Sequence, residues 1–215
     1  MRYFIARHGE TVFNAAARMQ GEAPHTPLTR LGFEQADAIG LAMREHLGPK
    51  PALSLWASPT GRALQTLAII AEHLELDWHG ARTDERLAEM DMGDWGGRYY
   101  ADVLASAGNF IDRENSLFTV QAPGGEWYDD IADRLSTWLG DHAAEKGDRL
   151  IVMHGISSRV LRGLLTNAPH RPECRAAVAP ALTQGSIVCI EHGVETVIHR
   201  PEHDGYSVRE PAGPA

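Results

Sequence analysis

Short apolar runs alternate along the chain with segments whose apolar residues recur at helical spacing. The runs Tyr3 to Ala6, Leu53 to Ala57 and Arg149 to Met153 each end abruptly in polar residues, which is typical of buried parallel strands. From Arg30 to Leu47 the apolar positions follow a helical period, and Thr29 can cap this helix. We expect a loop from Ser58 to Gly61 followed by a helix through about Leu74, and further helices from Trp127 to about Ala144 and from Ser157 to Leu165. We also expect a short strand at Trp78 to Ala81 and closing strands at Ile187 to Glu191 and Thr196 to His199.

Strands that alternate with helices predict an α/β fold. We expect a three-layer sandwich: a mostly parallel central sheet with helices on both faces. The 215 residues fit a single domain, placed at residues 1–200. Residues 90–125 have weak periodicity and many glycines and aromatics, and we interpret them as a helical lid or insertion over one end of the sheet. Residues 201–215 carry no pattern and predict an irregular tail.

The net charge of −9 removes the long-range attraction that a nucleic acid or an anionic membrane requires. No apolar run could span a bilayer, and the N-terminal run is too short for a signal peptide, so we expect a cytoplasmic protein. Two cysteines, Cys174 and Cys189, are too few for a disulfide framework in a chain of this length.

Four polar segments follow predicted elements at the places where open α/β sheets bind ligands. They contain Arg7-His8-Gly9, Arg62, Glu89 and His154-Gly155. Guanidinium forks match phosphate oxygens, and an imidazole nitrogen can attack phosphorus and leave again. Glu89 is the best candidate for the acid that protonates a departing alkoxide. Together these residue types indicate phosphoryl transfer, although each alone is commonly structural: a buried histidine, a surface arginine or a solvated carboxylate.

A metalloenzyme is a weaker hypothesis. His199 and His203 have the spacing of metal ligands, but Pro201 separates them and no HExxH-type motif is present. The sequence therefore predicts neither a metal nor a cofactor.

The motifs in this order resemble the histidine phosphatase superfamily, the phosphoglycerate-mutase-like proteins. The resemblance covers about Arg2 to Ile190. It departs from the family at His25, where many members have Asp, and at Gly96, where many have Glu. The matching segments are Arg7-His8-Gly9-Glu10-Thr11, Asn14, Arg18, Gln20-Gly21, Pro27-Leu28-Thr29, Gly32, Gln35-Ala36, Ser58-Pro59, Arg62-Ala63, Gln65-Thr66, Leu87, Glu89, Gly93, Trp95, Gly97, Gly125-Glu126 and His154-Gly155.

The resemblance implies a role for each matching residue. His8 is the expected nucleophile and Glu89 the expected proton donor, with Asp91 and Asp94 as the next acids to consider. The phosphoryl group is expected to contact Arg7, Arg62, His154, Asn14, Gln20 and Gly155.

Three functions remain open for such a site. Water attack on a phosphohistidine gives a phosphatase, whereas return of the phosphoryl group to another hydroxyl gives a phosphoglycerate-type mutase. The family's mutases hold the substrate carboxylate with a lysine and paired arginines, but this chain has lysines only at positions 50 and 146. We therefore expect a phosphatase for a small phosphorylated metabolite, with the mutase as the alternative. A catalytically retired binding protein would have lost one of the histidines or arginines. The exposed faces of the closing strands would allow a homodimer.

Overall fold

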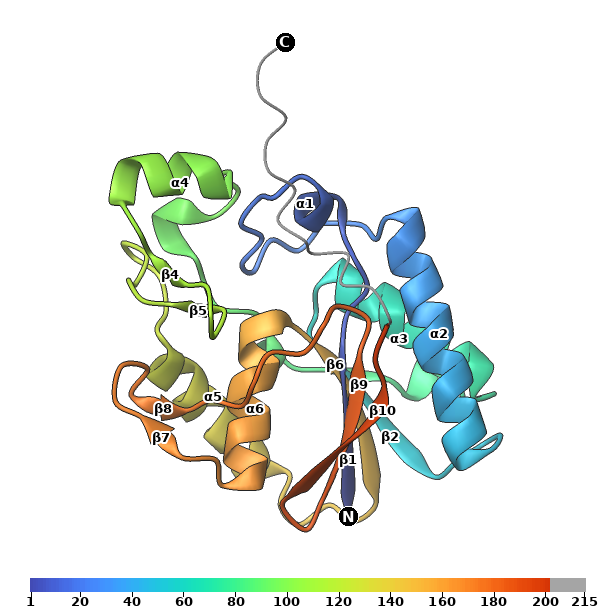
Figure 1. Cartoon of the computed structure of the whole chain (residues 1–215). Coiled ribbons are helices and arrows are strands. Elements are labelled where there is room, and N and C mark those ends of the chain that lie inside the picture. Colours follow the sequence, from blue (N-terminus) through green and yellow to red (C-terminus); the bar gives the residue numbers. More distant parts are fainter. Residues whose placement is uncertain (202–215) are drawn as a thin grey trace.

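The computed structural model describes residues 1–201 and has three layers, with a sheet between two sets of helices (Figure 1). Six strands form the central sheet in the order β10-β9-β1-β6-β2-β3. No helix within the described residues is long and apolar enough to cross a membrane. The strands are β1 (Arg2–Arg7), β2 (Leu53–Ala57), β3 (Arg82–Thr83), β6 (Asp148–Met153), β9 (Ile187–Glu191) and β10 (Val194–His199).

Strand β1 lies in the interior of this sheet. It pairs in parallel with β6, which pairs in parallel with β2, as β2 does with β3. Strand β9 runs antiparallel to β1 and to β10. The predicted α/β sandwich with a mostly parallel sheet is confirmed.

Helices cover both faces of the sheet, and the alternation of side chains along β1 explains why. Phe4 and Ala6 point into the core under helices α2 (Arg30–Leu47) and α3 (Gly61–His73), whereas Ile5 points into the core under α5 (Tyr128–Asp141) and α6 (Gly155–Thr166). All three side chains are fully buried. A strand that is buried on both faces reads as a continuous apolar run, which is how the sequence presents it.

Helix α2 forms over the predicted residues. The Thr29 side chain accepts a hydrogen bond from the Gly32 amide at 3.1 Å, which satisfies a donor that the first turn leaves open. Gly48 follows the last turn with a φ of 75°, a conformation that residues with a side chain rarely adopt.

The predicted strand at Trp78 to Ala81 is wrong. Residues Trp78–Gly80 form a 3-10 turn, because the Asp77 carboxylate accepts a hydrogen bond from the His79 amide at 3.0 Å. The strand β3 begins only at Arg82, where the backbone pairs with Trp56 of β2. The side-chain cap thus overrides the apolar pattern locally.

Residues 90–125, here called the insertion, are helical only in part. They contain a 3-10 turn, helix α4 (Tyr100–Ala107) and a hairpin of β4 (Ile111–Asp112) and β5 (Leu117–Phe118). Trp95 and Phe110 are buried there with ring centroids 5.1 Å apart, so these two aromatics pack the insertion. The sequence did not reveal the 3-10 turn of the insertion, at Gly93–Trp95. It also did not reveal the short elements outside the insertion, which are helix α1 (Val12–Ala15), a 3-10 turn at Glu85–Leu87, and a hairpin of β7 (His170–Arg171) and β8 (Ala176–Ala177). Of the predicted tail, residues 202–215 lie outside the described residues.

The loop after β1 rests directly on the first turn of α2. A Cβ placed on Gly9 would lie 2.2 Å from the Gly32 carbonyl oxygen, and one placed on Gly32 would lie 2.1 Å from the Glu10 carbonyl oxygen. Neither distance is compatible with a side chain, so both positions require glycine. This close contact fixes the backbone directly after His8.

We predict that Gly32→Ala destabilises the protein by about 2–3 kcal/mol, because the methyl group has to displace backbone atoms. Gly140 in α5 is the matched control, since a Cβ there meets nothing within 4 Å. Gly140→Ala should be neutral or stabilise by about 0.5–1 kcal/mol through helix propensity alone. Urea unfolding of the two variants measures both effects, and similar values would contradict the close contact.

Candidate active site at the carboxyl ends of the parallel strands

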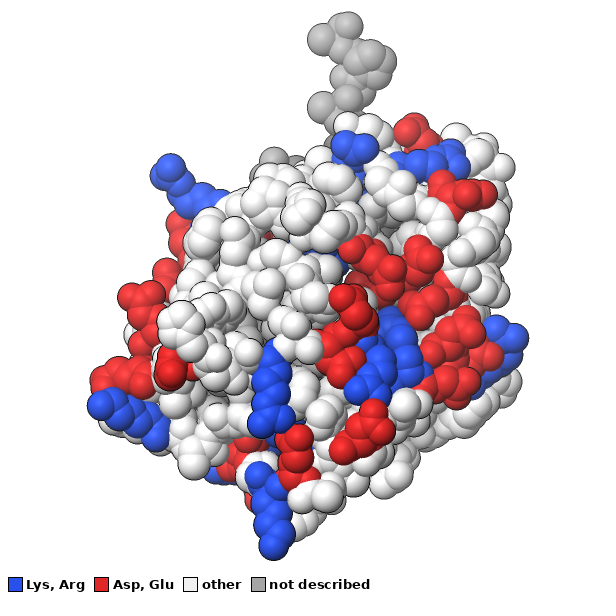
Figure 2. Space-filling view, turned by 180° about the vertical axis from the view of Figure 1, so that it is seen from behind, with Lys and Arg blue, Asp and Glu red and all other residues white. Residues whose placement is uncertain are grey.

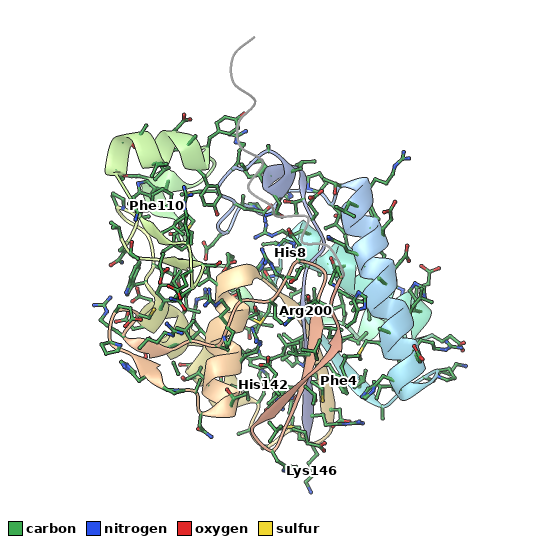
Figure 3. The ribbon with its side chains drawn as sticks, viewed as in Figure 1. Phe4, His8, Phe110, His142, Lys146 and Arg200 are labelled. Carbon is green, nitrogen blue, oxygen red and sulfur yellow. The ribbon has the colours of Figure 1, made fainter. Side chains whose placement is uncertain are left out.

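The pairing of β1 with β6 brings two histidines together. Arg7 pairs with Met153 at the end of the ladder, so His8 and His154 follow at the same edge of the sheet. Their ring centroids are 5.2 Å apart and their planes are inclined by 66°. Figure 3 shows His8 at this end of the molecule and Lys146 at the opposite end.

His8 is almost completely buried, and its ring is held by one backbone group. Its Nδ1 lies 2.7 Å from the Gly9 carbonyl oxygen, which can only accept a hydrogen bond. Nδ1 therefore carries the proton, and Nε2 keeps its lone pair. Burial, and secondarily the charge of Arg62, holds the pKa of His8 well below 6.5. The ring is a neutral nucleophile at neutral pH.

His154 has the opposite tautomer. Its Nδ1 accepts a hydrogen bond from Arg62 Nε at 3.2 Å, so the proton of the neutral ring is on Nε2. Burial, followed by the charge of Arg62, also lowers the pKa of His154 well below 6.5. Within residues 1–201 the buried Nε2 has no hydrogen-bond partner. An unsatisfied buried N–H is costly, and an oxygen of a bound ligand would satisfy it.

The protein itself uses most of the N–H groups of Arg62. Nε donates to His154, Nη1 donates to Ala23 O and Thr26 Oγ1, and Nη2 donates to Gly21 O at 2.7 Å. A guanidinium has five N–H groups, so one is left for a ligand. Burial lowers the pKa of Arg62 to about 10, and the side chain stays charged at neutral pH. Arg62 thus supplies a fixed positive charge and orients His154, but it has no free two-pronged fork.

Arg7 lies against the N-terminus of α6. Its Nη1 donates to the Leu182 carbonyl at 2.7 Å. A Cβ on Gly155 would lie 3.4 Å from Arg7 Nη2 and 3.4 Å from Glu89 Oε2. The arginine and the carboxylate therefore flank the same glycine.

Glu89 accepts backbone hydrogen bonds at the start of α6. The amide of Ile156 lies 3.0 Å from Oε2, and that of Ser157 lies 2.9 Å from Oε1. Behind it, Arg134 donates to the Glu89 carbonyl and forms an ion pair with Glu126. These contacts fix the carboxylate next to His154.

Asn14 and Gln20 meet at Thr11. The Thr11 hydroxyl lies 2.8 Å from Asn14 Oδ1 and 2.5 Å from Gln20 Oε1. Asn14 Oδ1 also accepts from Gln184 at 2.7 Å, and Gln184 is buried. Gln184 and Arg134 are contacts of the site that sequence analysis missed, because neither stands in a motif that ends a strand.

The structure separates the other candidate residues from this cluster. Asp94 is exposed, and Asp91 Oδ1 accepts from the Gly93 amide at 2.9 Å. Of the two departures, exposed His25 lines a hollow of about 220 Å³ next to Thr26, and Gly96 is exposed within the insertion.

Acidic side chains gather around arginines on the face of the molecule in Figure 2. Glu22 and Glu85 line a hollow of about 240 Å³ together with Thr60 and Ala88, the neighbour of Glu89. Burial and the nearby carboxylates, Asp91 among them, raise the pKa of Glu22. Glu22 and Glu85, here called the acidic rim, would repel a ligand with several negative charges at this hollow.

The structure bears on the metal hypothesis only within residues 1–201. There, no group of three or more histidine, cysteine and acidic side chains could hold a metal ion. His203 lies outside the described residues. Cys174 and Cys189 are free and buried.

The lowered pKa values of His8 and His154 predict a stability that depends on pH. Above pH 6.5 both rings are neutral in the folded and the unfolded chain. As the pH falls below 6.5, the unfolded chain binds protons that the folded site does not. The free energy of unfolding should therefore fall, by up to about 1.4 kcal/mol per pH unit for each ring.

Urea unfolding at pH 7 and pH 5 in phosphate-free buffer measures this loss. Other groups titrate in every variant, so the comparison is with His8→Asn/His154→Asn, in which the loss should be smaller. Equal losses in both proteins would show that the two rings do not have lowered pKa values.

Comparison with known proteins identifies the family to which this fold and this pair of histidines belong. A family model for the histidine phosphatase superfamily (branch 1) matches residues 3–200. A glucosyl-3-phosphoglycerate phosphatase from Mycolicibacterium vanbaalenii is 32% identical over 179 residues, which cover 78% of this chain and 75% of that protein. A probable phosphoglycerate mutase from Proteus mirabilis is 31% identical over 181 residues, which cover 81% of this chain and 79% of that protein.

Two further proteins define the extent of the similarity. A 6-phosphofructo-2-kinase/fructose-2,6-bisphosphatase from Caenorhabditis elegans is 31% identical over 79% of this chain, but the match spans only 34% of that longer protein. The solved structure of a mycobacterial glucosyl-3-phosphoglycerate phosphatase, in complexes with VO3, superimposes with a TM-score of 0.73 at 26% identity and covers 91% of this chain and 96% of that chain. The chain belongs to branch 1 of the histidine phosphatase superfamily.

Proposed function

We propose that the protein is a phosphomonoester hydrolase that acts on a small phosphorylated metabolite through a phosphohistidine at His8. The observation that carries this proposal is the pair of buried neutral histidines with opposite tautomers. His8 offers a lone pair at Nε2, and His154 offers an N–H without a partner in residues 1–201. A nucleophile beside a donor for the phosphoryl oxygens is what phosphoryl transfer needs.

In the first step the lone pair of His8 Nε2 attacks phosphorus and forms an N–P bond, while the bond from phosphorus to the ester oxygen breaks. The departing alkoxide takes a proton from Glu89. We propose that this proton enters the site together with the anionic substrate. Arg7, Arg62 and His154 balance the charge on the non-bridging oxygens.

In the second step water attacks the phosphohistidine. Glu89, now a carboxylate, accepts a proton from this water, the N–P bond breaks, and inorganic phosphate leaves. His8 returns to its neutral form with the proton still on Nδ1. We propose that no metal takes part, because the two arginines already supply positive charge at the site.

Three observations favour hydrolysis over mutase chemistry. The two lysines of the chain lie away from the cluster, since Lys50 forms a long contact with Glu75 and Lys146 lies at the far end of the sheet (Figure 3). Arg98 of the insertion is engaged with Ser106 at 3.0 Å. The acidic rim also disfavours a substrate that carries a carboxylate in addition to its phosphate. We further propose that the insertion acts as a lid over the site. We also propose that residues 1–200 form one catalytic domain and that the protein is cytoplasmic.

Glu89→Gln tests the proton donor. The amide keeps the size of the side chain but cannot deliver a proton, which matters for an alkyl leaving group and little for p-nitrophenolate. We expect the phosphorylation step to slow by about 100-fold or more for an alkyl phosphate and by about tenfold or less for p-nitrophenyl phosphate. Single-turnover release of the two alcohols measures this step. Equal losses on both substrates would reduce Glu89 to a positioning role.

Arg62→Lys tests the dual role of this arginine. A lysine keeps the charge, but it cannot hold Gly21, Ala23, Thr26 and His154 at once. We expect kcat/KM to fall by about 100-fold, together with a lower melting temperature. A variant with normal kcat/KM would show that the network of Arg62 does not serve the reaction.

A further inference from the structure

We propose that Gln184 is a positioning residue that fixes both the ring of His8 and the amide of Asn14. The inference rests on the proposed function, because it assigns Gln184 to the nucleophile of that reaction. Gln184 is buried in the loop of residues 182–186, here called the support loop, which precedes β9.

The side-chain NH2 group of Gln184 lies within hydrogen-bonding distance of two acceptors. Its Nε2 donates to Asn14 Oδ1 at 2.7 Å and lies 3.3 Å from the Gly9 carbonyl oxygen. That carbonyl is the same acceptor that Nδ1 of His8 uses at 2.7 Å. A carbonyl oxygen has two lone pairs, so it can accept from both donors and is fixed in direction by them.

The support loop is itself held against the end of β1. The Arg7 amide donates to Ser186 O at 3.0 Å, and Arg7 Nη1 donates to Leu182 O at 2.7 Å. Gly185 has a φ of 75°, and a Cβ there would lie 2.7 Å from the Cβ of Gln35. The loop thus contacts Arg7 directly, and through Gln184 it contacts Gly9 and Asn14.

The orientation of Asn14 follows from the same contacts. Its Oδ1 accepts from the Thr11 amide at 3.1 Å and from Gln184 at 2.7 Å. The side of the amide that remains for a ligand is Nδ2, a donor that suits a phosphoryl oxygen. If Asn14 flipped, it would present an acceptor to the same oxygen and repel it.

The ring of His8 depends on the other contact. When Nε2 bonds to phosphorus, the ring becomes positively charged, and the Gly9 carbonyl must accept a stronger hydrogen bond from Nδ1. A carbonyl that Gln184 holds in place needs no reorganisation at that moment. Outer contacts that orient a metal-binding histidine commonly contribute about 10- to 100-fold to its function, and we expect an effect of similar size for a histidine that attacks phosphorus.

Gln184→Met tests the inference, because methionine keeps the volume and removes both donors. We expect the single-turnover phosphorylation by p-nitrophenyl phosphate to slow by about tenfold or more, with little change in melting temperature. Thr137→Val is the control: Thr137 is exposed on α5, outside the insertion, and its Oγ1 donates to Asp133 O at 2.9 Å, so we expect an unchanged rate. Phosphorylation within twofold of the parent protein in Gln184→Met would overturn the proposal.

Nitrogen NMR of ¹⁵N-labelled histidines provides a readout that does not depend on activity. The parent protein should show His8 as the Nδ1–H tautomer, and Gln184→Met should show exchange between tautomers or a weakened Nδ1 hydrogen bond. An unchanged His8 spectrum in the variant would overturn the inference. If the parent protein shows the expected tautomer but forms no phosphohistidine, the proposed function fails, whereas the structural role of Gln184 is still decided by this spectrum.

Gln184→Glu replaces the methionine variant if the latter does not fold. Its carboxylate would repel Gly9 O and Asn14 Oδ1, and protonation would return one donor. The phosphorylation deficit should therefore shrink as the pH falls, and a deficit that does not vary with pH would overturn the proposal.

Discussion

The parallel pairing of β1 with β6 is the constraint on which the site depends. The ladder ends at Arg7 and Met153, and the His8 amide continues it with a hydrogen bond to Met153 O at 3.0 Å. The residue that follows each strand is a histidine, so two segments distant in the sequence place the rings of His8 and His154 at the same edge of the sheet. The close contact between Gly9 and Gly32 then constrains the backbone of the loop after β1. Geometry at the nucleophile is therefore a consequence of how the sheet is built.

Burial gives these two rings their chemistry. Both have lowered pKa values because the interior and the charge of Arg62 disfavour an imidazolium. Their tautomers differ because their partners differ: a carbonyl for His8 and an arginine for His154. Arg62 thus acts on both rings: its charge adds to the burial that keeps His8 neutral, and its Nε–H leaves the proton of His154 on Nε2. Arg62 can do this only because backbone carbonyls of Gly21 and Ala23 hold its guanidinium.

The sequence predicted the parts of the fold that apolar periodicity encodes, and the family resemblance named candidate residues that the structure brings together. Strand β2 and helix α2 coincide with the expected residues, because their patterns are long and their caps are local. The strand predicted at Trp78 failed because the Asp77 cap outweighs a short apolar run. Gln184 was missed for another reason: its contacts with Asn14 span 170 residues and leave no local signal. The use of most Arg62 donors by the protein is likewise a tertiary property, which a motif cannot reveal.

The most direct test of this account is to identify the phosphorylated atom. Rapid quench of the protein with ³²P-labelled substrate, followed by alkaline digestion and chromatography, identifies the phosphohistidine isomer, and proteolysis of a second sample at neutral pH with mass spectrometry of the labelled peptide identifies the residue. We expect an acid-labile, alkali-stable phosphate on Nε2 of His8, because the Gly9 carbonyl occupies the Nδ1 side. Label on Nδ1, on His154 or on a serine or cysteine would contradict it.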